Sequence, residues 1–258
     1  MFPVDYHMHT NISDGKADHL SMLRAAEAVG LREIGFSDHV TFFDAAWSAN
    51  RKRLDEMVAA VDAVHQTSKS VIVKLGAEMD YVPGKEAQIV SMIDNLPLDY
   101  VIGSVHFMGD WNFDTNPEDY AGKDFDKLYN DYFILIQDAA RCGLFDVIGH
   151  VDLIKKFSVY PSFPMQDIYE KTATIFKQSG VVVEVNTSGI TKQCKEIYPS
   201  YDFLKELKRQ KVPVTLGSDA HTPEAVGQHF NHAIGLLKYV GYTHVVQFIK
   251  RRREKIAL

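Results

Sequence analysis

Cysteine is scarce in this chain, which has only two among its 258 residues. Cys142 and Cys194 lie far apart in the sequence and form no closely spaced redox or metal-binding pair. The sequence therefore indicates no disulfide framework, and a reducing cytoplasm is the expected location.

Long apolar runs and an excess of basic charge are lacking as well. No apolar stretch is long enough to span a bilayer, and no basic segment followed by an apolar one opens the chain, so we expect no membrane contact and no secretory signal. The net charge of -6 argues against a nucleic-acid-binding protein, which usually has a basic face. The basic run Lys250–Arg253 is expected to be the exposed end of a last helix, where cations suit the helix dipole.

Short apolar segments alternate with amphipathic ones along the whole chain. The expected strands are Phe2–His7, Glu33–Ser37, Val71–Gly76, Tyr100–Ser104, Asp146–Gly149, Val181–Val185 and Val212–Leu216. The expected helices are Lys16–Val29, Asn50–Ser68, Lys85–Asn95, Asp124–Cys142, Met165–Gln178, Tyr201–Gln210, Thr222–Val240 and Thr243–Ile256. This alternation predicts an α/β fold of parallel strands with helical crossovers, and no linker divides it, so we expect one domain over residues 1–258. The longest irregular segment, Met108–Tyr120, is a candidate lid over the active site.

Six of the eleven histidines stand where these predicted strands end, with acidic residues beside them. Side chains at positions i and i+2 of a strand point the same way, so His7 projects with His9, and Asp219 with His221. In barrel folds the carboxyl ends of the strands build the active site. We therefore expect one pocket to gather the candidate metal ligands, which are His7, His9, Asp14, His39, Glu78, His106, His150, Asp219 and His221.

This set of ligands is larger than one metal ion requires, because a catalytic zinc commonly has three protein ligands and a water. The number fits a cluster of two or three ions, in which Glu78 is the natural bridging carboxylate. The acidic ligands carry less negative charge than such a cluster carries positive charge, and the remaining positive charge favours a phosphate ester as substrate. The other five histidines, which lie in predicted helices, are assigned no role.

Several longer motifs carry a resemblance to a known family, and together they cover nearly the whole chain. They are residues 76–84 (GAEMDYVPG), 99–107 (DYVIGSVHF), 143–152 (GLFDVIGHVD), 184–189 (EVNTSG), 196–200 (EIYPS) and 214–221 (VTLGSDAH). The chain resembles the PHP (polymerase and histidinol phosphatase) family, and within it most closely the histidinol-phosphate phosphatase branch.

This resemblance implies a distorted (β/α)7 barrel of the TIM-like type with a trinuclear site of zinc, manganese or iron. It would place one ion on His7, His9, Glu78 and Asp219, a second on Glu78, His106 and His150, and a third on Asp14, His39 and His221. The implied reaction is the hydrolysis of L-histidinol phosphate to L-histidinol and phosphate in histidine biosynthesis. The partner would be this small phosphate ester, with no nucleic acid and no membrane; a homo-oligomer is compatible with the sequence.

Residue roles beyond the ligands follow from the same comparison. The leaving alcohol needs a proton, and Asp219, His39 and His221 are the candidate catalytic groups. The family often has an arginine after the serine-glycine pair, whereas this chain has Lys192 there. Lysine lacks the bidentate fork of arginine. The expected substrate-binding residues are Lys155, Lys156, Asn186, Ser188 and Lys192.

Three other functions compete with this hypothesis. The first is a phosphoesterase of the same family that acts on another small monoester. The second is a nuclease or proofreading module, which would need a basic channel and a further nucleic-acid domain. The third is a regulatory metal-binding domain without catalysis, which would be expected to have lost some of the ligands that are present here.

Overall fold

The computed structural model describes residues 2–41, 43, 45–49, 51–94 and 96–258. Two of the predicted helix ends, Asn50 and Asn95, lie outside these described residues.

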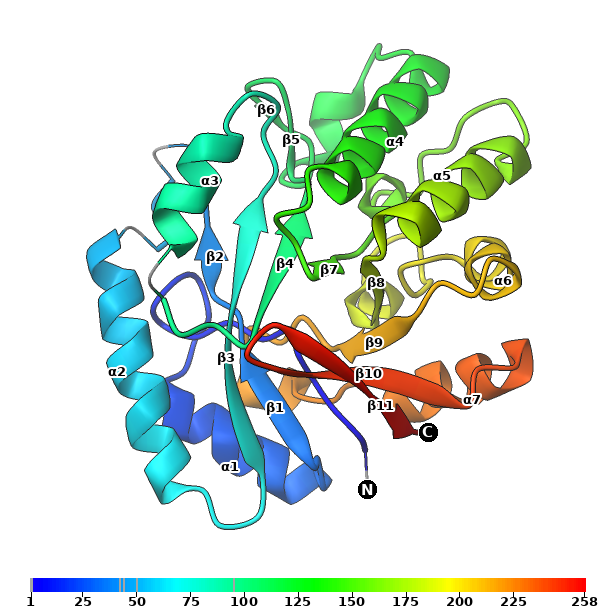
Figure 1. Cartoon of the computed structure of the whole chain (residues 1–258). Helices are drawn as coiled ribbons and strands as arrows, with labels where there is room; N and C mark the ends of the chain where they lie inside the picture. Colours follow the sequence, from blue (N-terminus) through cyan, green and yellow to red (C-terminus); the bar gives the residue numbers. More distant parts are fainter. Residues whose placement is uncertain (1, 42, 44, 50, 95) are drawn as a thin grey trace.

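A curled parallel sheet forms the centre of the fold (Figure 1). Its strands follow the order β1 (Glu33–Phe36), β3 (Ile72–Asp80), β4 (Tyr100–Ser104), β7 (Val147–Ile148), β8 (Val182–Asn186) and β9 (Val214–Gly217). The short strand β2 (His39–Val40) continues the line of β1 and pairs with the far end of β3. All of these pairs are parallel, as the alternation of strands and helices predicted.

The N-terminal segment closes the barrel between the first and last strands of this sheet. On one side Phe2 and Asp5 make parallel bridges to Leu31 and Ile34, and on the other side Met8 bridges to Ala220. The predicted strand Phe2–His7 is thus present only as isolated bridges, but it occupies the seventh place around the barrel. Its position brings His7 and His9 into the interior, where both are fully buried.

Helices cover the outside of the barrel. They are α1 (His19–Val29), α2 (Arg51–Thr67), α3 (Glu86–Ile93), α4 (Phe125–Arg141), α5 (Gln166–Ser179), α6 (Tyr201–Arg209) and α7 (Phe230–Val240), and α4, α5 and α6 lie side by side. The predicted start of α7 at Thr222 is wrong, because Pro223–Ala225 forms a separate 3-10 turn. The 3-10 turns Leu153–Lys155 and Ser188–Thr191 follow β7 and β8 at the mouth of the barrel.

The predicted last helix, Thr243–Ile256, is wrong. These residues form an antiparallel hairpin of β10 (His244–Ile249) and β11 (Arg252–Ala257). Phe248 of this hairpin packs against Tyr6 and Tyr100, with ring centroids 5.6 and 5.8 Å away. The Tyr100 ring occupies the space above Gly35 and Gly76, where a Cβ on either glycine would collide with it. The hairpin therefore fills the end of the barrel opposite the predicted ligands.

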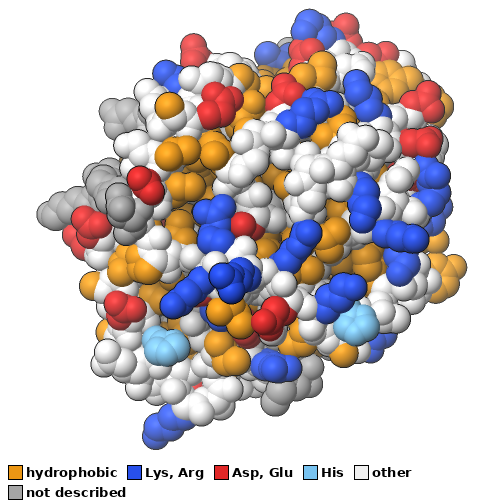
Figure 2. Space-filling view, in the orientation of Figure 1, with side chains coloured by type: hydrophobic (Ala, Val, Ile, Leu, Met, Phe, Trp, Pro, Cys, Tyr) orange, Lys and Arg blue, Asp and Glu red, His pale blue; other side chains and the backbone are white. Residues whose placement is uncertain are grey.

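The basic run Lys250–Arg253 is consequently not a helix end, and it forms the turn and start of β11 instead. Lys250 and Arg251 both have positive φ, at 48° and 65°. Arg251 pairs with Asp146 and donates to the Leu144 carbonyl at 2.8 Å, so part of the run fastens the hairpin to the barrel. In Figure 2 basic side chains gather over this hairpin.

The segment 108–120, which the sequence marked as a candidate lid, is anchored to the barrel. It continues from β5 (Phe107–Met108) into β6 (Trp111–Asn112), which pair as a short hairpin, and then into a 3-10 turn over Pro117–Tyr120. Phe113 and Tyr120 are buried, and the Phe113 ring packs edge-on against Tyr132 at 5.4 Å. The segment thus forms a wall beside the carboxyl ends of the strands.

Cys142 and Cys194 are both free of disulfides. Among the described residues, no helix has the length and apolar character needed to cross a membrane.

Replacing Phe248 with alanine should destabilise the fold by about 3–5 kcal/mol, because the buried ring would leave a cavity against Tyr6 and Tyr100. Urea denaturation followed by circular dichroism measures this loss. Ile249→Ala, in the next position of the same strand and 42% exposed, is the matched control and should cost less than about 1 kcal/mol. Equal losses for the two variants would contradict the role of Phe248 in closing the barrel.

Candidate metal centre

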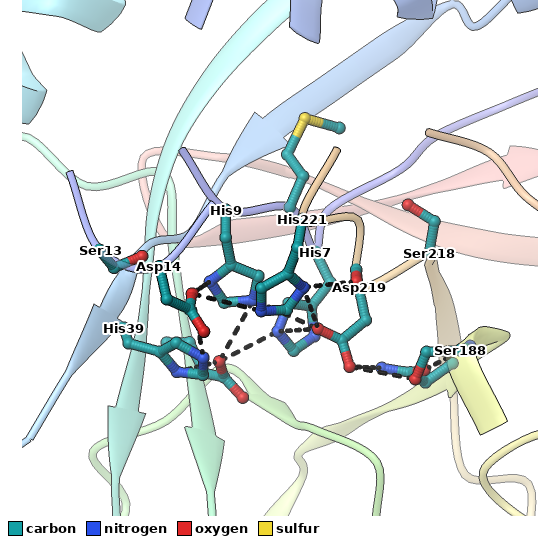
Figure 3. A network of polar contacts seen from close by, with 12 residues as sticks. His7, His9, Ser13, Asp14, His39, Ser188, Ser218, Asp219 and His221 are labelled. Atoms are coloured by element: carbon teal, nitrogen blue, oxygen red, sulfur yellow. Dashed lines mark hydrogen bonds and ion pairs between the residues drawn. The ribbon is translucent and has the colours of Figure 1, made fainter. Parts of the chain in front are cut away.

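All nine predicted ligands lie at the carboxyl end of the barrel and approach one another closely. Their donor atoms fall into four overlapping groups whose members lie within 4.8 Å of one another. These groups are His9, Asp14, His39 and His221; His7, His150 and Asp219; His7, His9 and Glu78; and His39, Glu78 and His106. Figure 3 shows His7, His9, His39 and His221 converging with Asp14 and Asp219.

Glu78 lies at the centre of this cluster and is 1% exposed. Imidazole nitrogens approach its Oε2 from His39 at 2.7 Å, His7 at 3.1 Å and His9 at 3.6 Å. Its Oε1 faces His150 at 2.9 Å and His106 at 3.6 Å. Each carboxylate oxygen therefore faces a different set of nitrogens, which is the arrangement that a carboxylate bridging two ions needs.

The position of Glu78 follows from strand register. His39 of β2 pairs directly with Glu78 of β3, and Glu78 pairs with Ile102 of β4. Parallel strands bring these residues to the same level of the barrel although they are remote in sequence. Ser104, at the end of β4, donates its hydroxyl to Glu78 Oε1 at 2.6 Å and fixes the carboxylate.

Asp219, two residues after the end of β9, has a backbone conformation that few non-glycine residues adopt, with φ at 54°. Its Oδ1 lies 3.3 Å from His9 Nε2 and 3.7 Å from His7 Nε2. Its Oδ2 accepts hydrogen bonds from Ser188 Oγ at 3.1 Å and Asn186 Nδ2 at 3.4 Å. Such conformations cluster at functional sites, and here the conformation aims the carboxylate at the imidazoles.

Asp14 joins a second part of the cluster, nearer the solvent. Its Oδ1 lies 3.2 Å from His221 Nε2, 3.8 Å from His39 Nε2 and 4.0 Å from His9 Nδ1. Asp14, His39 and His221 share one donor group with His9, and the family resemblance implied the first three as the ligands of one ion.

Two acidic residues outside the nine predicted ligands contact imidazole rings of the cluster. Glu184 lies 2.6 Å from His7 Nδ1, and its other oxygen accepts the backbone N–H of His150 at 2.8 Å. Asp80 lies 2.7 Å from His106 Nδ1. A carboxylate on the far nitrogen of a metal-binding histidine fixes the ring and raises its basicity. These roles were not predicted from the sequence. For Glu184 a signal was present, because it is the single acidic residue inside the otherwise apolar expected strand Val181–Val185.

The acidic residues and imidazoles of the cluster shift one another's pKa values. Burial opposes ionisation of Glu78 and Asp219, but the surrounding imidazoles outweigh burial and hold both pKa values well below the usual range. Burial, together with the neighbouring His39 and His221 rings, lowers the pKa of His9 to about 4, so this imidazole stays neutral. Burial disfavours protonated His106, yet Asp80 and Glu78 outweigh it and raise its pKa to about 10.

These residues fit divalent metal ions on grounds of hydrogen bonding as well. His7 Nε2, both ring nitrogens of His9, Glu78 Oε2 and Asp14 Oδ1 are buried, and none of their close contacts in the described part of the chain has the geometry of a hydrogen bond. Buried polar atoms without partners are costly, and neutral imidazole with ionised carboxylate is a common donor set for divalent transition metals. The cluster is a divalent-metal site.

A cavity of about 380 Å³ opens directly over this cluster. Asp14, His39, His106, His150, Asp219 and His221 line its floor, and Asp114, Lys156, Ser188, Thr191, Lys192, Tyr198, Thr222 and Gln228 are among the residues of its wall. Three of the five predicted substrate-binding residues, Lys156, Ser188 and Lys192, therefore face the cavity.

Lys155 and Asn186, the other two predicted substrate contacts, are not among the residues that line the cavity. The Lys155 ammonium is buried, 3.0 Å from Asp152 and 2.9 Å from Glu196. Asn186 donates to Glu184 and Asp219. Both side chains are therefore engaged in supporting the walls of the site.

The barrel and its cluster define the class of this molecule, a metal-binding α/β-barrel protein. The family model described as "PHP domain" matches residues 5–188, and the chain belongs to this family. A relative from Deinococcus radiodurans, named "Probable histidinol-phosphatase", is 36% identical over 245 residues, which cover 92% of this chain and 93% of the relative. The histidinol-phosphatase of Lactococcus lactis is 24% identical over 99% of this chain and 97% of its own.

Solved structures agree on the fold. The crystal structure of histidinol phosphate phosphatase from Lactococcus lactis, complexed with zinc, L-histidinol and phosphate, superposes with a TM-score of 0.85. It is 24% identical and covers 98% of each chain. A structure from Listeria monocytogenes, described as a "putative histidinol phosphatase", has a TM-score of 0.80 at 19% identity, over 89% of this chain and 99% of its own.

Replacing Glu184 with glutamine should lower metal affinity about 10- to 100-fold, because the His7 ring loses its charged partner while its shape is kept. Metal content after dialysis against graded chelator, measured by plasma mass spectrometry, tests this. Glu254→Gln, on the exposed strand β11, is the control. Retention of metal by Glu184→Gln at the wild-type level would show that Glu184 does not support the metal ligands.

Proposed function

We propose that this protein is a histidinol-phosphatase, a phosphoric monoester hydrolase that converts L-histidinol phosphate to L-histidinol and phosphate in histidine biosynthesis. The observation that carries the proposal is the nine-residue donor set beneath a cavity with Lys156 and Lys192 on its wall. The relative of 36% identity, which spans nearly the same length, supports the choice of substrate. We propose that residues 1–258 act as one metallophosphoesterase domain in the cytoplasm.

We assign three divalent ions of zinc, manganese or iron to this cluster, on the ligand sets that the family resemblance implied. One set is His7, His9, Glu78 and Asp219, the second is Glu78, His106 and His150, and the third is Asp14, His39 and His221. Bound ions of this kind supply a water of lowered pKa as nucleophile and neutralise charge on phosphoryl oxygens.

The residues of the chain itself then bind and orient the ester. Lys192 is exposed at the edge of the cavity, and Lys156 lies on its wall, so both are placed to attract a dianionic phosphate. Ser188, which donates its hydroxyl to Asp219, also keeps the Asp219 carboxylate turned toward the ions. Among Asp219, His39 and His221, which face the cavity, we place the group that returns a proton to the leaving alkoxide.

L-Histidinol phosphate should be the preferred substrate among simple monoesters. Phosphate release from this ester, p-nitrophenyl phosphate and a nucleotide monophosphate, each with manganese- or zinc-loaded protein, measures the preference as a ratio of kcat/KM. A preference of about 100-fold or more is expected if the cavity contacts the leaving group as well as phosphate. Comparable weak rates on all three would retain a metal-dependent phosphatase and reject this substrate.

Replacing Glu78 with glutamine should lower kcat/KM by about 1000-fold or more, because the residue that faces both halves of the cluster loses its charge. Circular dichroism should show the fold retained, since the side chain keeps its size. Glu118→Gln, in an exposed position of the 3-10 turn Pro117–Tyr120, is the control and should keep wild-type activity. Full activity in Glu78→Gln would reject the assigned centre.

A further inference from the structure

We infer that Asp114 is a specificity-determining residue that binds the ammonium group of an amino-alkyl phosphate substrate. The inference rests on the proposed function and extends it, because it names the part of the substrate that this carboxylate recognises.

Asp114 differs from the other carboxylates of the cavity in the groups that it contacts. The carboxylates that line the cavity are Asp14, Asp114 and Asp219. Asp14 and Asp219 face imidazoles of the metal cluster at 3.2 to 4.0 Å and are assigned to ions. Asp114 makes no such contact and pairs with Lys156 instead, so it is the carboxylate of the described cavity wall that is not assigned to an ion.

Local structure holds Asp114 in place. The neighbouring Phe113 is 1% exposed, and its backbone N–H donates to the His106 carbonyl at 3.2 Å. The backbone N–H of Asp114 itself donates to the Asn112 side chain at 3.0 Å. Because His106 is on the floor of the cavity, these hydrogen bonds fix the position of Asp114 relative to the metal cluster.

Asp114 also forms an ion pair on the cavity wall. Lys156 Nζ lies 2.6 Å from Asp114 Oδ1 and 2.8 Å from the Asp114 carbonyl oxygen. The other carboxylate oxygen, Oδ2, accepts no hydrogen bond from the described residues. The side chain is 25% exposed, so that a ligand in the cavity can reach this oxygen.

The pair of opposite charges matches the charges of the proposed substrate. L-Histidinol phosphate carries an anionic phosphate and, on the adjacent carbon of the same short chain, a cationic amine. A cavity that offered only metal ions and lysines would attract the phosphate and repel the amine. Asp114 next to Lys156 provides a carboxylate for the amine within the same wall, and a charge-assisted hydrogen bond selects for it.

The test compares L-histidinol phosphate with its analogue lacking the amine, 3-(imidazol-4-yl)propyl phosphate, in the metal-loaded enzyme. The readout is the ratio of kcat/KM for the two esters. Asp114→Asn should lower this ratio by about 10- to 100-fold, the loss that one hydrogen bond between charged groups represents. Asp119→Asn, an exposed aspartate of the same segment that does not line the cavity, is the matched control and should leave the ratio unchanged.

Three results would overturn the inference, and each has a different meaning. If Asp114→Asn loses kcat/KM equally on both esters, Asp114 acts only by holding Lys156, and the proposed function stands without the inference. If the wild-type enzyme hydrolyses p-nitrophenyl phosphate but neither imidazole ester, the proposed function fails, and the inference fails with it. Calorimetric binding of L-histidinol to the metal-loaded wild type and Asp114→Asn proteins gives a second measure without turnover, and equal affinities would also contradict it.

Discussion

A buried carboxylate surrounded by imidazoles is the constraint on which the rest of this structure depends. Glu78 is inside the barrel, almost without solvent contact, and its charge must be compensated there. Nitrogens from five histidines supply part of this compensation, and metal ions bound between them would supply the rest. Because these histidines come from different strand ends, the barrel has to hold each strand in register for the centre to exist at all.

Two features of the fold provide this register. The N-terminal segment closes the barrel and thereby carries His7 and His9 to the same level as Glu78. At the opposite end, the aromatic rings of Tyr6, Tyr100 and Phe248 pack against one another inside the barrel and resist a shift of the strands. The interior of this barrel is therefore densely packed at one end and holds paired charges at the other.

Much of this could be predicted from sequence. Helices with clear apolar periodicity, such as α2 and α4, lie within a residue or two of their expected ends. The C-terminal hairpin was missed because its turn residues, Lys250 and Arg251, both have positive φ without being glycine or asparagine, the usual signals of such a turn. The burial of Lys155 could not be predicted for another reason. Lys155 ends a 3-10 turn and Lys156 follows it, so their side chains point apart, and only packing decides that Lys156 faces the cavity.

The sequence by itself determined the fold class, the family and the nine candidate ligands, because strand ends, residue types and spacing are local properties of the chain. Tertiary structure alone decided which acidic residues support which imidazoles and which charges face the cavity. Glu184 meets His7, 177 residues away, and Lys156 meets Asp114 across 42 residues. Contacts of this kind depend on the closing of the barrel and on side-chain direction, and no local pattern in the sequence records either.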